Sequence, residues 1–298
     1  MPTYLLLPLA AAIVYSLGSI LIKRALKEGV TMDQSFHLTN LLMGTLFLPL
    51  FFLEKQVIQW DQLFRPLAMG ATFFAATWLT FVAIRRGDVS LVTPIMGTKV
   101  VFVAVGMVLF TGQALSLSLW LAAIMTPLGI LVMSFSDFRK GNHLWFTIGV
   151  TLASAALFGV NDVMVNAWAS SFGPLAFLSI GSITVSFISI LIWSCQGRPA
   201  LLARSAGRAH AGWGACCIGL QAILMGIALA FFTDATGINV VYSSRGLWAI
   251  VLVVVFGSFL GNSEHRDQGR AFIGRVVGTV ILTVAVVIAV LDRANAAQ

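Results

Sequence analysis

Two permanent cations, Lys99 and Arg245, each lie in the middle of a long apolar stretch of the chain. Lys99 stands in the segment VTPIMGTKVVFVAVGMVLF, and Arg245 stands in VVYSSRGLWAIVLVVVFG. Asp162, in LFGVNDVMVNAW, is the only acidic residue at comparable depth in an apolar stretch. A charge in the hydrocarbon region of a bilayer costs about 2.5–3.5 kcal/mol or more, so it usually faces a partner, a cavity or a substrate. These residues therefore predict that a polar molecule passes through the interior of the protein.

Side chains suited to a substrate site recur at helical spacing around two of these charges. They are Tyr242, Arg245 and Trp248 at intervals of three, and Phe158, Asp162 and Asn166 at intervals of four. Residues three or four apart share one face of a helix, so both faces are polar and aromatic rather than aliphatic. Trp78 and Trp248 are the tryptophans that lie inside apolar stretches, where they either line a cavity or pack in the core. We predict substrate contacts from Lys99, Arg245, Tyr242, Trp248, Trp78 and Asn166.

The depth of each charge along its helix suggests how the charges are compensated. Arg245 lies about 10 Å and Asp162 about 9 Å from the same membrane face, at 1.5 Å per residue. We therefore expect an Asp162–Arg245 ion pair, the alternative being that water or backbone groups satisfy each charge separately. Lys99 lies near the midplane with no acid expected at its depth. It is predicted to anchor an anionic substrate, unless its flexible stem carries the ammonium towards one face.

The elements that position these residues are membrane helices. Apolar residues make up 59% of the chain and charged residues only 10%, with a mean hydropathy of +0.95. A soluble domain carries about 25% charged residues, so this chain cannot cover a water-facing surface. Ten stretches are long enough to cross about 30 Å of hydrocarbon. They are residues 4–22, 34–53, 66–84, 89–110, 114–136, 143–168, 174–195, 211–233, 238–260 and 271–291. The predicted fold class is an all-α polytopic membrane protein with ten transmembrane helices.

The distribution of charge predicts an inverted repeat. Of the 18 Lys and Arg residues, 13 lie in connections on one side of the predicted membrane and 3 on the other. Among the first five predicted helices, the connections after the first and third helices are basic. The corresponding connections of the second five, after the sixth and eighth helices, contain no Lys or Arg, as expected if the second copy is inverted in the membrane. We predict a five-plus-five inverted repeat, residues 1–140 and 141–298. Such repeats recur in secondary transporters, which bind substrate near the midplane. The scattered basic residues form no stripe with aromatics, which argues against nucleic acid as a partner.

Several local motifs resemble those of the drug/metabolite transporter (DMT) superfamily, in particular its EamA-like members. They are LGSILIKRAL at the end of the first predicted helix, AIRRGDVSLVTPIMG entering the fourth, and TGQALSLSLWLAAIMTPLGILVM leading into the fifth. The resemblance implies a ten-helix transporter fold, and packing of the fifth helix against the tenth. It also implies anion contacts from basic residues on the fourth and ninth helices, where Lys99 and Arg245 lie. The GRVVG motif at Gly274–Gly278 is a GxxxG pattern, which favours close helix packing inside the chain rather than a dimer, so we expect a monomer.

These patterns predict a secondary transporter for a small polar metabolite, anionic or zwitterionic, working by alternating access in the bacterial cytoplasmic membrane. The coupling species is left open between a proton and a counter-substrate. A translocator of lipids or lipid-linked sugars, which the superfamily also contains, is the first alternative. An intramembrane enzyme is disfavoured because Asp162 has no second acid or His at its depth. No metal or cofactor is predicted, because the four histidines lie near predicted loops. The charge bias places both termini outside the cell, whereas the resemblance places them inside.

Overall fold

The structure is a computed structural model that describes residues 2–86, 89–134, 144–196, 201, 206–256 and 270–296. All regular elements in these ranges are helices, and the predicted boundary between residues 140 and 141 lies outside them. Two are short 3₁₀ turns, η1 (Thr3–Leu5) and η2 (Trp60–Gln62). The α-helices are α1 (Leu6–Lys27), α2 (Met32–Phe52), α3 (Phe64–Arg86), α4 (Val89–Met96), α5 (Lys99–Thr111), α6 (Leu117–Ser134), α7 (Leu144–Phe172), α8 (Pro174–Cys195), α9 (Arg208–Phe231), α10 (Ala235–Tyr242), α11 (Arg245–Phe256) and α12 (Arg270–Ala296).

Most of these helices have the length and composition of membrane spans. Among the described residues, 8 candidate spans are apolar enough and long enough to cross a bilayer, and Leu117–Met133 forms a shorter apolar helix. Large apolar side chains such as Leu109, Phe110 and Leu128 are exposed on the outer surface, as lipid contact requires. The chain is thus a polytopic all-α membrane protein. The ninth predicted span, 238–260, corresponds to the two short helices α10 and α11, and the predicted count of ten spans is not confirmed.

The fourth predicted span is interrupted just before Lys99. Residues 89–110 were expected to form one helix, but α4 ends at Met96 and α5 begins at Lys99. Pro94 has no N–H to continue the helical pattern, and its ring crowds the preceding turn. The next two backbone N–H groups, of Gly97 and Thr98, donate to carbonyls only three residues back, at 3.1 and 3.0 Å. The tightened turn places Lys99 at the first position of α5.

The same interruption occurs before Arg245. Here α10 and α11 are separated by Ser243 and Ser244. The Ser243 hydroxyl donates to the Val240 carbonyl at 2.5 Å, so a side chain takes an acceptor near the end of α10. Both interrupted segments therefore have one plan: an eight-residue helix, a two-residue break, and a cation as the first residue of the next helix. Discontinuous helices of this kind are where transporters place substrate and ion sites.

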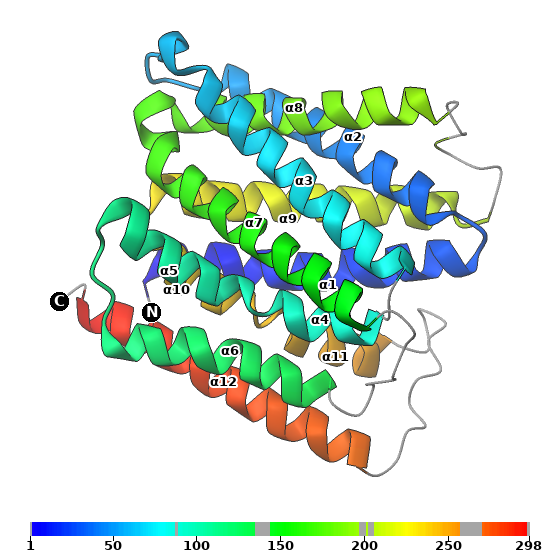
Figure 1. The fold of residues 1–298 in the computed structure, drawn as a ribbon, viewed down its shortest axis with the longest axis vertical. Helices are drawn as coiled ribbons and strands as arrows, with labels where there is room; N and C mark the ends of the chain where they lie inside the picture. The colour runs from blue at the N-terminus through cyan, green and yellow to red at the C-terminus, as the bar shows by residue number, and fades with distance from the viewer. Residues whose placement is uncertain are drawn as a thin grey trace.

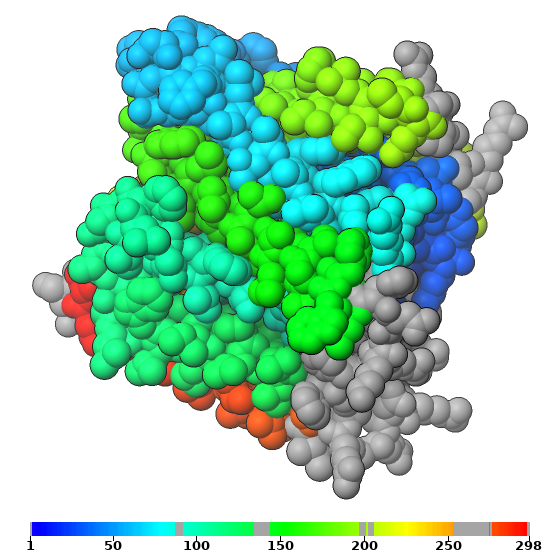
Figure 2. Space-filling view, in the orientation of Figure 1, coloured from blue at the N-terminus to red at the C-terminus, as the bar shows by residue number. Residues whose placement is uncertain are grey.

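The helices pack in matched pairs that relate the first six to the last six (Figure 1). Helix α1 packs on α9 as α3 packs on α7, and α5 packs on α7 as α11 packs on α1. Helices α2 and α8 pack on each other, and so do α6 and α12, which run in opposite directions side by side. The space-filling view shows α3, α5, α6 and α7 covering one side of the molecule (Figure 2). The interrupted helices α4, α5, α10 and α11 are thereby held against α7 and α1.

Glycines bring α6 and α12 into close contact. A Cβ added at Gly278 would lie 2.5 Å from the carbonyl oxygen of Gly129, and one added at Gly129 would lie 3.1 Å from the carbonyl oxygen of Gly278. Only glycine fits such an approach of two backbones. The Gly274–Gly278 motif therefore packs within the chain, as expected from the resemblance.

Candidate functional site

Lys99 and Asp162 form an ion pair in the interior. The Lys99 Nζ lies 2.7 Å from the Asp162 Oδ2, and the two side chains are 14% and 8% exposed. The expected Asp162–Arg245 ion pair is therefore wrong in its partner, and so is the expectation that Lys99 has no acid at its depth. The physical reason is that α7 continues to Phe172, four residues beyond its predicted end. Asp162 lies about 15 Å from that end at 1.5 Å per residue, close to the depth of the α4–α5 break.

Asn239, which the sequence analysis did not select, completes this pair. Its Nδ2 donates to the Asp162 Oδ2 at 2.7 Å and to the Ala235 carbonyl at 3.0 Å, and the residue is 2% exposed. The Asp162 carboxylate thus receives one charged and one neutral donor from two different interrupted segments. A buried amide carries a smaller desolvation cost than a charge, so Asn239 does not stand out in an apolar sequence as Lys99 does.

Arg245 lies between two tyrosines. Its guanidinium carbon is 4.8 Å from the Tyr15 ring centroid and 4.9 Å from the Tyr242 ring centroid, and its Nη1 donates to the Tyr242 hydroxyl at 3.1 Å. The Ser16 hydroxyl donates to the Arg245 carbonyl at 2.7 Å, which ties α1 to the start of α11. Within the described ranges, no carboxylate lies at ion-pair distance from Arg245.

Tyr242 connects the two cations into one group. The Lys99 Nζ lies 6.0 Å from the Tyr242 ring centroid and 5.6 Å from the Phe158 ring centroid. We call this group the central polar cluster: Tyr15, Lys99, Phe158, Asp162, Asn239, Tyr242 and Arg245. Since Asp162 balances one of its two cations, the cluster carries one net positive charge, at Arg245. Cations held against aromatic faces in a desolvated site gain about 2 kcal/mol or more.

Three of the predicted substrate residues make their contacts outside this cluster. The Asn166 Nδ2 donates to the carbonyls of Leu229 and Phe232 at 2.9 and 2.7 Å, at the end of α9. Trp78 lies in an aromatic group with Phe36, Phe74 and Phe81, with ring centroids 5.6–6.2 Å away. Trp248 is half-buried against the main apolar core, one turn after Arg245. Among the described residues, no group of three or more His, Cys, Asp or Glu side chains is arranged to hold a metal ion.

Comparison with known proteins supports the resemblance. The model of the EamA-like transporter family matches residues 2–135, close to the first predicted unit. A solved crystal structure of a protein aligns with 96% of this chain and 97% of its own, at a TM-score of 0.73 and 14% sequence identity, which shows a shared fold. No curated protein matches the chain. Residues 2–135 are thus similar to the EamA-like transporter family, a family of membrane transporters within the DMT superfamily.

Proposed function

We propose that this protein is a secondary transporter for a small anionic or zwitterionic metabolite, with Arg245 as the anion-binding residue. The observation that carries the proposal is the surroundings of Arg245. Its charge is met by two tyrosines, while Lys99 is occupied by Asp162. An arginine that lacks a carboxylate partner in the described interior is suited to bind a carboxylate or phosphate through its planar fork of N–H groups. This moves the role of anion anchor from Lys99, where the sequence analysis placed it, to Arg245.

We infer that transport proceeds by alternating access between two inverted halves, residues 1–140 and 141–298. The matched packing of α1–α6 and α7–α12 supports this repeat, and the central polar cluster draws side chains from both halves. We assign coupling to the Lys99–Asp162 pair, because a proton on Asp162 would release the Lys99 ammonium; exchange for a counter-substrate is the other mode. The transporting unit is a monomer in the bacterial cytoplasmic membrane, since the Gly274–Gly278 surface is already used inside the chain.

The test measures binding and uptake with the purified protein. Thermal stabilisation is screened with small carboxylates, phosphates and their uncharged amide or alcohol analogues, and the stabilising compound is then followed into liposomes. Arg245→Gln is expected to weaken binding of the anion roughly 10–100-fold, the effect of losing a charged hydrogen-bond donor. Arg65→Gln is the control, because Arg65 lies at the beginning of α3 beside Phe64 and Trp168. Stabilisation by the uncharged analogues alone, or unchanged uptake by Arg245→Gln, would contradict the proposal.

A further inference from the structure

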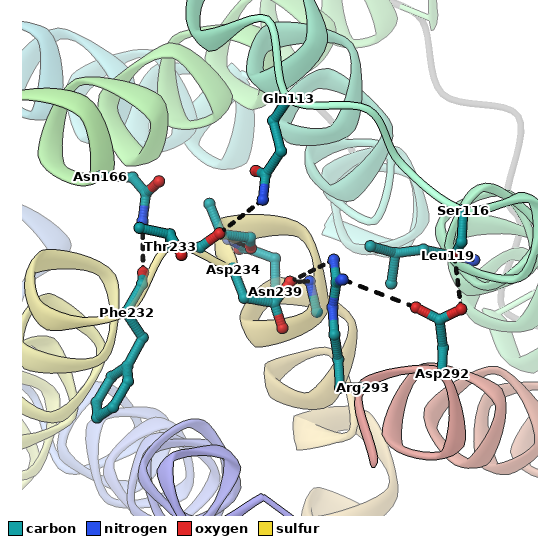
Figure 3. A network of polar contacts seen from close by, with 12 residues as sticks. Gln113, Ser116, Leu119, Asn166, Phe232, Thr233, Asp234, Asn239, Asp292 and Arg293 are labelled. Carbon is teal, nitrogen blue, oxygen red and sulfur yellow. Dashed lines mark hydrogen bonds and ion pairs between the residues drawn. The ribbon is translucent and has the colours of Figure 1, made fainter. Parts of the chain in front are cut away.

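A second polar network lies at the face where both termini and the α9–α10 connection meet (Figure 3). Its centre is Asp234, which caps α10 by accepting a hydrogen bond from the Gly237 N–H at 3.0 Å. Arg293 of α12 lies 2.9 Å from the Asp234 carboxylate through its Nη2. Tyr4, in the turn before α1, donates its hydroxyl to the other Asp234 oxygen at 2.7 Å. The Tyr4 ring also stacks on Phe232, with 4.8 Å between centroids.

Two further contacts join the α5–α6 connection to this network. The Ser116 hydroxyl donates to the Asp292 carboxylate at 2.6 Å, and the Gln113 Nε2 donates to the Thr233 carbonyl at 2.9 Å. Asp292 in turn lies 3.8 Å from the Arg293 Nη1. The side chains of Asp234, Asp292 and Arg293 are 10%, 12% and 18% exposed, so these charges are largely removed from water.

The ion pairs of this network lie within one proposed half, and its contacts between the halves are hydrogen bonds from neutral side chains. Its ionic partners Asp234, Asp292 and Arg293 all belong to residues 141–298. The three side chains that reach across from residues 1–140 are neutral donors: Tyr4, Gln113 and Ser116. If the halves separate at this face, only hydrogen bonds from neutral donors break, and the charges stay compensated within one half. Losing such a hydrogen bond costs less free energy than breaking a buried ion pair, which would leave a charge uncompensated.

We propose that this network is the gate that holds the face bearing the termini closed. The inference rests on the proposed alternating access and adds to it the bonds that must open. The gate is also connected to the central polar cluster, because Asp234 caps α10 and Tyr242 ends it. An eight-residue helix is about 12 Å long, so a displacement at the cluster reaches the gate through one rigid element.

The test follows the accessibility of a single cysteine at position 244. The natural cysteines at 195, 216 and 217 are replaced by alanine, and Ser244→Cys is introduced, because the buried Ser244 hydroxyl has no hydrogen-bond partner to lose. Labelling by a membrane-impermeant maleimide is measured in sealed vesicles of each orientation, with a C-terminal tag identifying the face that carries the termini. Tyr4→Phe with Ser116→Ala is expected to raise labelling from that face at least about tenfold, since two bonds to carboxylates are lost.

The control removes two hydroxyls that bond within their own helices, by Thr45→Ala with Thr283→Ala. Its labelling is expected to stay within about twofold of the unmodified reporter, on the scale of a neutral surface substitution. If the double variant folds poorly, Tyr4→Phe alone is expected to give a smaller rise from the same face. Unchanged labelling, or an equal rise from both faces, would overturn the gate. The assay uses no substrate, so a failure of Arg245 as anion anchor in the uptake test remains separate from a failure of the gate.

Discussion

At the scale of single residues, the partner of Asp162 determines which intramembrane cation is available to a substrate. Lys99 and Asp162 compensate each other at 2.7 Å, and Asn239 holds the carboxylate from α10. Arg245 keeps its charge beside two aromatic rings. A transporter must also release its substrate, and it is an advantage for release that only one of the two cations lacks a carboxylate partner among the described residues. In the proposed function, an anionic substrate would meet one arginine and two phenol groups rather than two cations at once, which would limit how tightly it is bound.

The ion pair predicts a specific pattern of stability in double mutants. Asp162→Asn leaves the Lys99 ammonium buried without its carboxylate, and Lys99→Met leaves the buried Asp162 carboxylate without its cation. Each is expected to lower the free energy of unfolding by about 3–5 kcal/mol, as for other buried pairs from which one partner is removed. The Lys99→Met, Asp162→Asn double variant should recover much of that loss. The measurement is chemical or thermal unfolding of purified protein in detergent.

The matched control for this cycle is Asp162→Asn combined with Arg245→Gln. The coupling between these two losses should be smaller than that between Asp162 and Lys99, because Arg245 donates to the Tyr242 hydroxyl while Asp162 pairs with Lys99. Coupling between Asp162 and Arg245 that exceeds the coupling between Asp162 and Lys99 would restore the pairing expected from sequence. Reversal of the Lys99→Met loss by the second substitution is the result that the structure requires.

The sequence identified the charged members of the central polar cluster but not how they are connected. Lys99, Asp162, Arg245 and Tyr242 stand out because their side chains are costly or unusual in apolar stretches. Their pairing depends on helix ends and breaks, and an error of four residues at the end of α7 moves Asp162 by about 6 Å. Tyr15 and Asn239 carry no comparable signal, because isolated tyrosines and amides are common in membrane helices.

At the scale of elements, the fold is distinguished by its two interrupted segments, α4–α5 and α10–α11, and by the closely packed α6–α12 pair. The positions of the apolar helices followed from hydropathy, since each must cover the bilayer thickness. The breaks before Lys99 and Arg245 did not, because proline and paired serines are tolerated inside continuous membrane helices when neighbours satisfy the freed backbone groups. Whether such residues interrupt a helix depends on how the segment packs against α7 and α1. The local sequence of the segment does not reveal these contacts with other helices.

Close packing of α6 on α12 predicts the effect of enlarging its glycines. Gly278→Leu places a side chain where the Gly129 backbone now lies, so the two helices must separate. We expect a loss of about 1–3 kcal/mol or more in the free energy of unfolding, as for other overpacked contacts. Gly149→Leu is the control, because a Cβ added at Gly149 meets nothing within 4 Å. Equal losses for the two variants would show that the helix pair is not closely packed.

At the scale of the whole molecule, the two faces differ in both charge and structure. The face with the termini carries Lys55, Arg65 and Arg293, while the charge pattern of the sequence predicts that 13 other basic residues lie on the opposite face. Arg293 is withdrawn into the gate network by Asp234 and Asp292, which leaves this face with still less free positive charge. Basic connections are retained in the cytoplasm during insertion, so the bias predicts that both termini and the gate face outward.

The orientation is tested with a C-terminal reporter that is active only in the cytoplasm. In the full chain it should be inactive, because α12 ends on the face that carries few basic residues. The same reporter fused after Gln196, at the end of α8 on the basic face, should be active and shows that the fusion itself is functional. A C-terminal reporter that is active while the Gln196 fusion is not would place the termini inside. The proposed gate would then close the cytoplasmic face, and the basic connections would lie outside the cell against the usual rule.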